Sequence, residues 1–256
     1  MILLLGGTGD SRDLAVFLIA GGQEIMLTTV TGYGAQLAEQ TGVHLVLSGA
    51  LSPAQLRALI SKHQIKAIVD ATHPYAEAIS HNAIAIAGEC SLSYCRYERQ
   101  NTAIEEEPLL YRVNSLEEAA KKASELGDNI LLTIGSKGLE KFLQSPDIQG
   151  KRVIARVLPD REVIGKCLEL GLTAKEIIAM QGPFSRELNQ AIYRQTATTV
   201  VVTKDGGTTG GTDTKLNAAI EMGIPVVLIL RPKLDYPHKC TTFQEVLDFL
   251  TKGEKR

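Results

Sequence analysis

Short apolar runs alternate with amphipathic stretches almost from one end of this chain to the other. Runs such as 1–5, 24–30, 67–70 and 199–203 have the length of a strand and are rich in Leu, Ile, Val and Thr. The stretches between them carry apolar residues at helical spacing. This order is typical of parallel sheets whose strands are connected by helices. The sequence therefore predicts an α/β fold.

The alternation lapses once, between Tyr97 and Pro108, where polar residues and the acidic triplet 105–107 dominate. It restarts with an expected strand at 109–113 and a helix that a capping box, Ser115-x-x-Glu118, opens. We therefore expect two domains, residues 1–100 and residues 101–256. Each is expected to be a mostly parallel sheet flanked by helices.

Composition restricts the classes of function. The 256 residues include 27 Lys and Arg against 29 Asp and Glu, which gives a formal net charge of -2. This balance argues against a protein that grips nucleic acid or anionic lipid over its whole surface. No apolar run approaches the roughly 18 residues of a membrane-spanning helix, and the first residues lack the basic leader of a signal peptide. We expect a cytoplasmic protein without a nucleic-acid or membrane partner, and its oligomeric state stays open.

Neither a metal site nor a disulfide framework is indicated. No two cysteines form a Cys-x-x-Cys pair, and none stands near a group of histidines. We expect reduced thiols in or near the core and no bound metal. The cysteines are Cys90, Cys95, Cys167 and Cys240, and the histidines without metal-like spacing are His44, His63, His81 and His238.

The turn after the first strand, Gly6-Gly7-Thr8-Gly9, leads directly into a helix. Backbone N–H groups and the positive end of that helix suit a phosphate. The dinucleotide-binding fingerprint is only partial, because Arg12 stands where its third glycine belongs. No Asp or Glu follows the second strand at 28–31 to hold a ribose 2′-hydroxyl, so NADPH is as well supported as NADH. The alternative is a turn that needs glycine for its dihedral angles alone. The candidate cofactor-binding residues are Gly6, Gly7, Thr8, Gly9, Asp10, Ser11, Arg12, Thr29 and Thr72.

A second candidate site follows the fourth expected strand, at Asp70 to Ala76. In open α/β sheets ligands bind at the carboxyl ends of the strands. His73 and Tyr75 can each donate or accept a proton and are the catalytic candidates, while Asp70 could orient a neighbour. The alternative is an Asp that caps a helix beside a half-buried His.

Cations mark three further strand ends. Arg96 follows the fifth expected strand, and its guanidinium suits carboxylates, although a surface pair with Glu98 is the alternative. The glycine-rich segment 203–215 joins a strand to a helix and carries Lys204 and Lys215, which with backbone amides suit an anion. A loop without a ligand is the alternative there. Arg231 follows the last apolar run.

Five segments that include these residues occur in a fixed order: 4–8 with 10–12 behind it, 69–76, 96–99, 203–207 with Lys215 behind it, and 223–226 leading to 231–232. In this order they resemble the precorrin-6A reductase and cobalt-precorrin-6A reductase family of cobalamin biosynthesis. Members of this family reduce a ring double bond of precorrin-6A, or of its cobalt complex, with a nicotinamide cofactor. The resemblance covers nearly the whole chain. The chain departs from it at 31–34, where family members often carry a longer segment richer in arginine.

The resemblance implies two Rossmann-like domains with the active-site cleft between them. The domain 1–100 would bind NADPH or NADH, and the domain 101–256 would contribute the cleft for the tetrapyrrole. A macrocycle with acetate and propionate side chains requires Arg and Lys in that cleft. The implied cofactor preference stays open, and the cobalt-containing substrate is favoured. The expected substrate-binding residues are Asp70, His73, Tyr75, Arg96, Lys204, Asp205, Gly206, Gly207, Lys215 and Arg231.

Two other classes of function are compatible with a glycine turn after the first strand. One is a nucleotide-dependent transferase of Rossmann type, which would oxidise no nicotinamide. The other is a regulator that binds a dinucleotide without turning over a tetrapyrrole.

Overall fold

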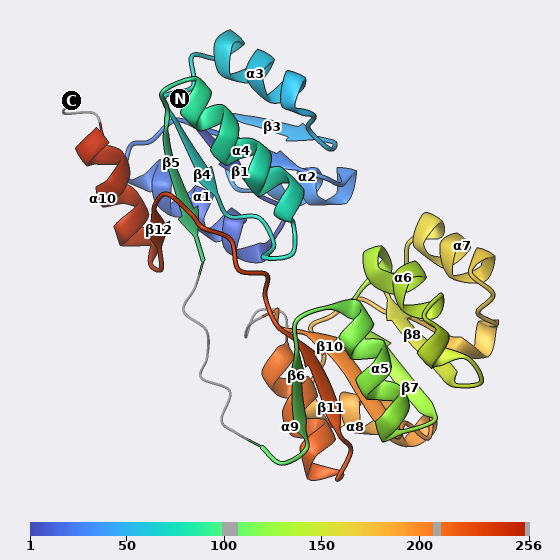
Figure 1. The fold of residues 1–256 in the computed structure, drawn as a ribbon. Helices are drawn as coiled ribbons and strands as arrows, with labels where there is room; N and C mark the ends of the chain where they lie inside the picture. The colour runs from blue at the N-terminus through green and yellow to red at the C-terminus, as the bar shows by residue number, and fades with distance from the viewer. Residues whose placement is uncertain (99–106, 207–210, 254–256) are drawn as a thin grey trace. The chain divides into compact units, whose positions relative to one another are not determined.

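The structure is a computed structural model that describes residues 1–98, 107–206 and 211–253 (Figure 1). The chain divides into two compact units: unit 1 is Met1–Gln100 with Pro232–Arg256, and unit 2 is Asn101–Arg231. The expected second domain, 101–256, is therefore wrong in its last part. The chain returns to unit 1 after Arg231 because the apolar side chains of Cys240, Val246 and Leu250 pack into the core of that unit.

Unit 1 contains a parallel six-stranded sheet in the order β3-β2-β1-β4-β5-β12. Its first three strands and their helices follow one another closely along the chain. The strands are β1 (Ile2–Leu5), β2 (Ile25–Thr29), β3 (Leu45–Ser48), β4 (Ala67–Asp70), β5 (Ser93–Tyr97) and β12 (Lys239–Cys240). The helices are α1 (Gly9–Ala20), α2 (Gly32–Glu39), α3 (Pro53–Lys62), α4 (Glu77–Glu89) and α10 (Phe243–Gly253).

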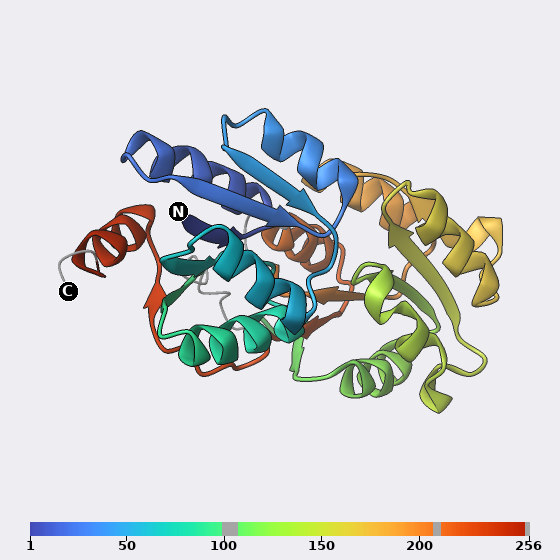
Figure 2. The ribbon, with the colours of Figure 1, turned by 90° about the horizontal axis from the view of Figure 1, so that it is seen from above.

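Both faces of the unit 1 sheet are buried, because helices cover each of them (Figures 1 and 2). Alternate residues of a strand point to opposite faces. Leu4 and Val69 accordingly pack with α1 and α10, while Leu3 and Ile68 pack with α3 and α4. For this reason β1 is apolar on both faces, and so is β4 up to Asp70 at its end.

Unit 2 also contains a parallel six-stranded sheet, in the order β9-β8-β7-β10-β11-β6. Its strands are β6 (Leu110–Val113), β7 (Asn129–Thr133), β8 (Arg152–Val157), β9 (Ile177–Ala179), β10 (Val200–Lys204) and β11 (Val226–Ile229). Its α-helices are α5 (Leu116–Leu126), α6 (Leu139–Leu143), α7 (Arg161–Glu169), α8 (Arg186–Gln195) and α9 (Thr212–Glu221), with 3-10 turns at Ser136–Gly138, Pro146–Ile148 and Ala174–Glu176.

Helices α8 and α9 pack against one another on the same face of the unit 2 sheet. Their buried side chains Ile192 and Leu216 meet Ile154 of β8 and Val201 of β10 there. Helix α5 contacts β10 and β11, and it also contacts α6 (Figure 1). The unit is thus an α/β sheet whose helices have their own apolar core.

The two sheets have the same strand order, once β6 is given the place that β12 has in unit 1. Counted from β1 and from β7, each sheet has the order 3-2-1-4-5-6 of the doubly wound, Rossmann-type fold. The expected fold class is therefore confirmed. The sixth strands of the two sheets are exchanged. β6 follows β5 of unit 1 along the chain but joins the sheet of unit 2, and β12 follows β11 of unit 2 but joins the sheet of unit 1.

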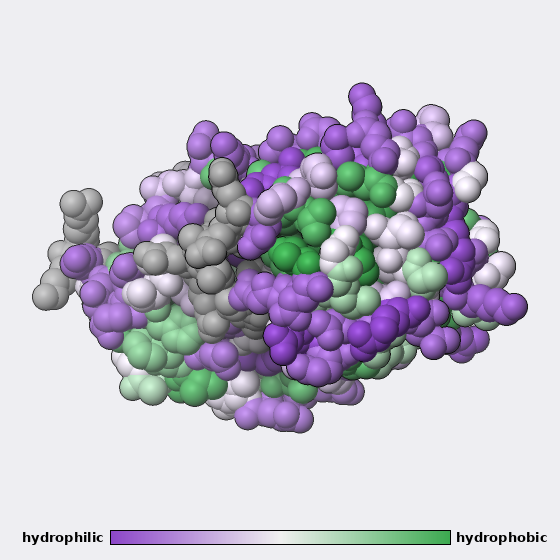
Figure 3. Space-filling view, turned by 90° about the horizontal axis from the view of Figure 1, so that it is seen from below, coloured by the Kyte–Doolittle hydropathy of each residue, from purple (hydrophilic) through white to green (hydrophobic). Residues whose placement is uncertain are grey.

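The surface carries mostly hydrophilic residues, with apolar residues in patches between them, on the face that Figure 3 shows. Among the described residues, no helix is long and apolar enough to cross a membrane. The described residues also contain no cluster of three His, Cys, Asp or Glu that could hold a metal ion. All four cysteines are free thiols, and Cys90 is exposed rather than part of the core.

Candidate functional site

In unit 1 the strand order changes direction between β1 and β4, and α1 and α4 leave the sheet there on opposite faces. Open α/β sheets bind their ligands at this point, beyond the carboxyl ends of the strands. The loops that follow β1 and β4 are joined by a hydrogen bond, which Thr8 Oγ1 donates to the carbonyl of Ala71 at 3.3 Å. The glycine turn and the segment after Asp70 therefore lie in one place, as the sequence predicts.

Ser11 holds the glycine turn closed. Its Oγ accepts the N–H groups of Gly7 and Thr8, each at 3.1 Å, and donates to the carbonyl of Thr8 at 2.8 Å. Thr8 is the N-cap of α1, and its Oγ1 accepts the N–H of Ser11 at 3.0 Å. Ser11 is completely buried. Two amides that we expected to face a phosphate thus bind a hydroxyl of the turn itself, and Ser11 shapes the turn instead of contacting a ligand.

The turn still leaves room for a phosphate. Gly6 is packed so closely that a Cβ there would lie 2.6 Å from Cδ1 of Leu27. Gly7 has φ +118° and is exposed, and a Cβ built on it would meet no atom within 4 Å. A ligand can therefore approach the backbone of Gly7 and the positive N-terminus of α1, which begins at Gly9. The half-buried Arg12 lies beside it, with Nη1 donating to the carbonyl of Thr8 at 3.3 Å.

The end of β2 carries no acidic side chain. Thr28 and Thr29 are buried, and Thr29 Oγ1 donates to the carbonyl of Thr31 at 3.1 Å, so Thr29 fixes the chain rather than facing a ligand. The exposed side chains that follow are those of Val30, Thr31 and Tyr33, and the exposed fractions of Val30 and Tyr33 are 57% and 55%. The segment after β2 therefore presents apolar, hydroxyl and aromatic side chains but no charge.

Asp70 lies at the centre of a buried polar network at the end of β4. Its Oδ1 accepts hydrogen bonds from Arg96 Nη1 at 2.8 Å, from Thr72 Oγ1 at 2.7 Å and from the backbone N–H of Thr72 at 3.0 Å. Its Oδ2 accepts from Ser80 Oγ at 2.6 Å and from Tyr94 Oη at 2.9 Å. Arg96 Nη2 donates to the carbonyl of Thr72 at 2.9 Å. The network thus ties the loop after β4 to β5 and α4.

Burial decides the role of this network. Burial alone would raise the pKa of Asp70, but the charge of Arg96 and the hydrogen bonds from Ser80 and Thr72 outweigh it and lower the pKa. Arg96 is 1% exposed, and the ring of Tyr236 lies 5.4 Å from its guanidinium carbon. In this arrangement Asp70 and Arg96, both expected to bind the substrate, are buried and each is the other's partner. Thr72, also buried, belongs to the same network and not to a cofactor surface.

His73 is the exposed residue that this network presents. Its Nδ1 accepts the backbone N–H of Tyr75 at 3.3 Å, and the two rings lie 5.5 Å apart. In the neutral imidazole the proton then resides on Nε2, because Nδ1 is an acceptor. Tyr75 is partly buried beside it. Both catalytic candidates thus lie in the loop after β4, where the side chain of His73 is exposed.

Unit 2 repeats the arrangement at its own change of strand direction, between β7 and β10. Asp205 follows β10 and is 8% exposed, and Arg231 Nε lies 3.3 Å from its Oδ2 and donates to its carbonyl at 3.3 Å. Thr212 is fully buried, and its Oγ1 accepts the N–H of Gly206 at 3.1 Å, much as Ser11 holds the first turn. Arg231, expected to face the substrate, is thus already paired. Gly207, another expected contact, lies outside the described residues.

The remaining expected cations, Lys204 and Lys215, lie at the end of β10 and in the first turns of α9. Both are partly buried. Exposed apolar side chains occur at neighbouring strand ends, with Leu158 after β8 at 57% and Met180 after β9 at 38%. The carboxyl edge of unit 2 therefore combines cations with apolar surface.

Residues 1–251 match the family described as precorrin-6x reductase CbiJ/CobK. The chain belongs to this family of precorrin-6A reductases. A cobalt-precorrin-6A reductase of Priestia megaterium is 42% identical over 254 residues, 98% of both chains. Another from Methanocaldococcus jannaschii is 36% identical over 251 residues, 97% of both. The solved structure of a CobK precorrin-6A reductase has a TM-score of 0.78 at 25% identity and covers 98% of this chain and 96% of its own.

Membership in the precorrin-6A reductase family confirms the resemblance that the motifs indicate. It makes the chain an oxidoreductase of cobalamin biosynthesis, and it does not favour a transferase or a regulator. A reductase of this family requires a nicotinamide cofactor. The open backbone of Gly7 at the N-terminus of α1 fits the phosphates of such a cofactor.

Three residues of this precorrin-6A reductase family member escaped the sequence analysis: Ser80, Tyr94 and Tyr236, which surround the Asp70–Arg96 pair. A signal existed for Tyr94, because it stands two residues before Arg96 on β5 and so shares its face. No local pattern marks Tyr236, which comes from the segment that returns to unit 1.

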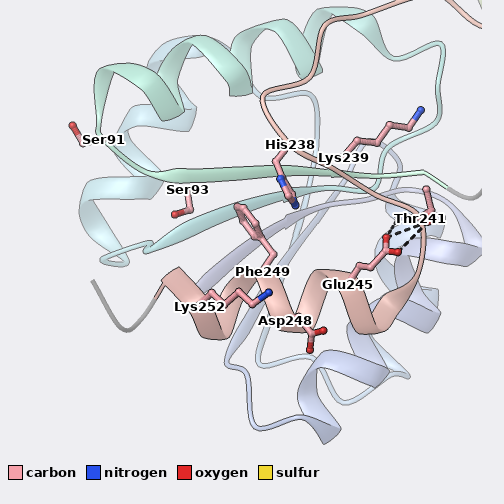
Figure 4. A pocket seen from close by; sticks show the side chains of 9 residues that line it. All are labelled: Ser91, Ser93, His238, Lys239, Thr241, Glu245, Asp248, Phe249 and Lys252. Carbon is pink, nitrogen blue, oxygen red and sulfur yellow. Dashed lines mark hydrogen bonds between the residues drawn. The ribbon is translucent and has the colours of Figure 1, made fainter.

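A groove of about 860 Å³ lies elsewhere in unit 1, along the outer edge of the sheet (Figure 4). His238 stacks on Phe249 there, with ring centroids 4.6 Å apart. Acidic and basic side chains both line it, and it contains none of the residues expected to bind cofactor or substrate. Its lining residues are Ser91, Ser93, His238, Lys239, Thr241, Glu245, Asp248, Phe249 and Lys252.

Proposed function

We propose that this chain reduces one ring double bond of cobalt-precorrin-6A with a hydride from NADPH or NADH. The observation that carries the proposal is the family match over residues 1–251, with relatives whose full length the chain covers. The cobalt form is favoured because the relatives at 42% and 36% identity carry the name cobalt-precorrin-6A reductase. The product would be the corresponding cobalt-precorrin-6B.

The cofactor would bind at the glycine turn of unit 1. A bound nicotinamide supplies the hydride, and the chain has to hold it and position it. The exposed backbone of Gly7, the N-terminus of α1 and the guanidinium of Arg12 support a pyrophosphate there. β2 ends without a carboxylate, and the sequence 30–34 contains neither Arg nor Lys. We therefore expect weak discrimination between NADH and NADPH.

The tetrapyrrole would contact the loop after β4. The Asp70–Arg96 network fixes this loop from inside, so its residues act by positioning and not by contact. His73 is exposed at the surface of the loop, and its Nδ1 accepts the N–H of Tyr75. It would donate a hydrogen bond or a proton to the ring as the hydride arrives. Tyr75 is a competitor for this role.

The proposal is tested by mixing the purified chain with cobalt-precorrin-6A or with metal-free precorrin-6A. The absorbance of NADH or of NADPH is then followed in each mixture. Oxidation of the cofactor that depends on the tetrapyrrole, with one cofactor consumed per ring reduced, is expected. Binding of cofactor without its oxidation in either mixture would refute the proposed reaction. The relative rates with the two tetrapyrroles and with the two cofactors assign the substrate and the preference.

A further inference from the structure

Unit 2 contains a buried cation that none of the sequence motifs includes. Arg156 lies on β8 in the otherwise apolar run Val153–Val157, and it is 6% exposed. It points to the face that α8 covers, since its Nη1 donates to Oδ1 of Asn189 on that helix at 2.7 Å. Its position is near the carboxyl end of β8, at the edge of the sheet where ligands bind.

Neutral groups hold the side chain of Arg156. Its guanidinium carbon lies 4.3 Å from the ring centroid of Phe184, in the loop between β9 and α8. Asn189 is itself fully buried, and its Nδ2 donates to the carbonyl of Ser185 at 2.9 Å. No carboxylate in the described part of the chain forms an ion pair with Arg156. The position of the guanidinium is thus fixed while its charge stays uncompensated.

Lys215 is a second cation in this part of unit 2, on the helix that packs against α8. It lies in α9, where its carbonyl accepts the hydroxyl of Tyr193 from α8 at 3.1 Å. Burial and the charge of Arg156 lower the pKa of Lys215 to about 8. Its Nζ has neither an ion pair nor a hydrogen bond with any residue in the described ranges.

The groups around Lys215 supply no counter-charge. From α8 comes Tyr193, whose pKa burial raises to about 12, so that it is neutral near pH 8. From β8 comes Arg156. Asp213 stands on the same helix as Lys215 and forms no ion pair with it, and Asp205, which follows β10, pairs with Arg231.

Arg156 is buried and Lys215 is partly buried, and like charges that interact there repel one another and lose hydration. The other buried arginine that ends a strand, Arg96, has a carboxylate partner at 2.8 Å, and Arg231 lies 3.3 Å from one. Arg156 and Lys215 differ, because no carboxylate among the described residues forms an ion pair with either of them. An anionic ligand would compensate the two charges and so reduce the repulsion. Residues that lower the stability of the unbound protein in this way are typical of a binding site.

We propose that Arg156 and Lys215 form a binding site for one carboxylate of the tetrapyrrole substrate. This inference rests on the proposed function and adds the group of the substrate that unit 2 recognises. A guanidinium and an ammonium together match the two oxygens of a carboxylate. The exposed side chains of Leu158 and Met180, at the ends of β8 and β9, suit an apolar macrocycle better than a sugar phosphate.

The site couples binding to protonation. A bound carboxylate favours the charged form of Lys215, so its pKa rises and the complex takes up a proton near pH 8. The free amine with a pKa of about 8 is roughly nine-tenths protonated at pH 7 and one-tenth at pH 9. The affinity for the substrate is therefore expected to fall about tenfold between these values.

A binding experiment with cobalt-precorrin-6A and the full chain, without cofactor, tests the site. The absorption of the tetrapyrrole reports binding and is measured at pH 7 and at pH 9. Arg156→Met and Lys215→Met should each weaken binding at pH 7 by about tenfold or more. Lys215→Met should also remove the pH dependence. The control is Lys166→Met, which changes an exposed lysine of α7 that pairs with Glu140. The control and all variants should keep the wild-type affinity for NADPH.

Asn189→Asp sharpens the test, because it places a carboxylate 2.7 Å from Arg156 without changing the size of the side chain. This internal anion should raise the melting temperature and weaken substrate binding. A purely structural Arg156 would give the higher melting temperature with unchanged binding. Arg156→Met should not lower the melting temperature, since it removes an uncompensated buried charge.

The outcomes separate this inference from the proposed function. If the wild type neither binds cobalt-precorrin-6A nor oxidises a cofactor with it, the proposed function fails. If the wild type turns over but Lys215→Met and Asn189→Asp bind the substrate normally, only the Arg156–Lys215 site is overturned. A loss of NADPH affinity in place of tetrapyrrole affinity would also overturn it, and would assign the site to a nucleotide phosphate.

Discussion

Arg96→Leu is the change that best tests the buried network of unit 1. The substitution leaves Asp70 with four hydrogen bonds but without its counter-charge, inside a site that excludes water. Breaking a buried ion pair in this way typically costs about 3–5 kcal/mol. At roughly 2–4 °C per kcal/mol for a chain of this size, the melting temperature of unit 1 should fall by about 6–20 °C.

Urea denaturation followed by circular dichroism measures this loss, and two further variants interpret it. Arg57→Leu is the matched control, because Arg57 also binds a carboxylate, Glu89, through two hydrogen bonds but is half exposed. It should shift the urea midpoint much less than Arg96→Leu does, because an exposed ion pair contributes little to stability. Asp70→Asn in the Arg96→Leu background should recover much of the loss, because it removes the stranded charge.

The pH dependence provides a second check. The pKa of Asp70 is lower in the folded chain than in the unfolded one, so its ionisation stabilises the fold above the unfolded value of about 4. This contribution is lost as the pH falls from there toward the folded value. Asp70→Asn should therefore flatten the loss of stability below about pH 4. Additive effects of the two substitutions, or a stable Arg96→Leu protein with a raised KM for the tetrapyrrole, would refute the buried pair and restore Arg96 as a direct contact.

Three more predictions concern unit 1. Gly7→Val should abolish cofactor binding measured by calorimetry, whereas Gly22→Val, with a comparable positive φ and equally open space, should share the strain of about 1–3 kcal/mol and keep the affinity. Ser11→Ala leaves two amides of the turn without their acceptor and should lower the stability by about 1–3 kcal/mol and also lower the affinity for the cofactor. An unchanged urea midpoint would contradict the role given to the Ser11 hydroxyl. If His73 is the acid, His73→Asn should lower the single-turnover rate by about a hundredfold or more and keep the affinity for the cofactor. A rate within about threefold of the wild type from pH 6 to 8 would make His73 a positioning residue.

The regular elements could be predicted because their signals are local. β4 was expected at 67–70 and lies at Ala67–Asp70, since an apolar run ends there at a charge and a proline follows. The dipeptide Ser52-Pro53 is typical of a helix start, and α3 begins at Pro53 with Ser52 as its N-cap. β12 was missed because two residues, Lys239 and Cys240, show no periodicity. Nothing local tells which sheet such a segment joins.

The candidate site was predicted in place but only partly in role. Strand ends carrying Asp70 and Arg96 could be located, because parallel strands bring their carboxyl ends together. Whether these charges face a ligand or one another depends on burial, which the sequence around each of them does not reveal. The surroundings of Arg156 could not be predicted from the sequence either. A cation inside an apolar strand was visible in the sequence, but the absence of a carboxylate around it became evident only from the packing of α8 and α9.

The exchange of edge strands has a consequence for the order in which the chain can fold. Unit 2 is continuous in sequence, from Asn101 to Arg231, and β6, its edge strand, is synthesised first of all its strands. Unit 1 begins at Met1, yet its sheet lacks β12 and its core lacks α10 until the segment from Pro232 onward has left the ribosome. Until then β5 is an edge strand without β12 beside it, and Arg96 of the Asp70–Arg96 pair lacks its contact with the ring of Tyr236. The unit that is translated first is therefore the one that completes its fold last.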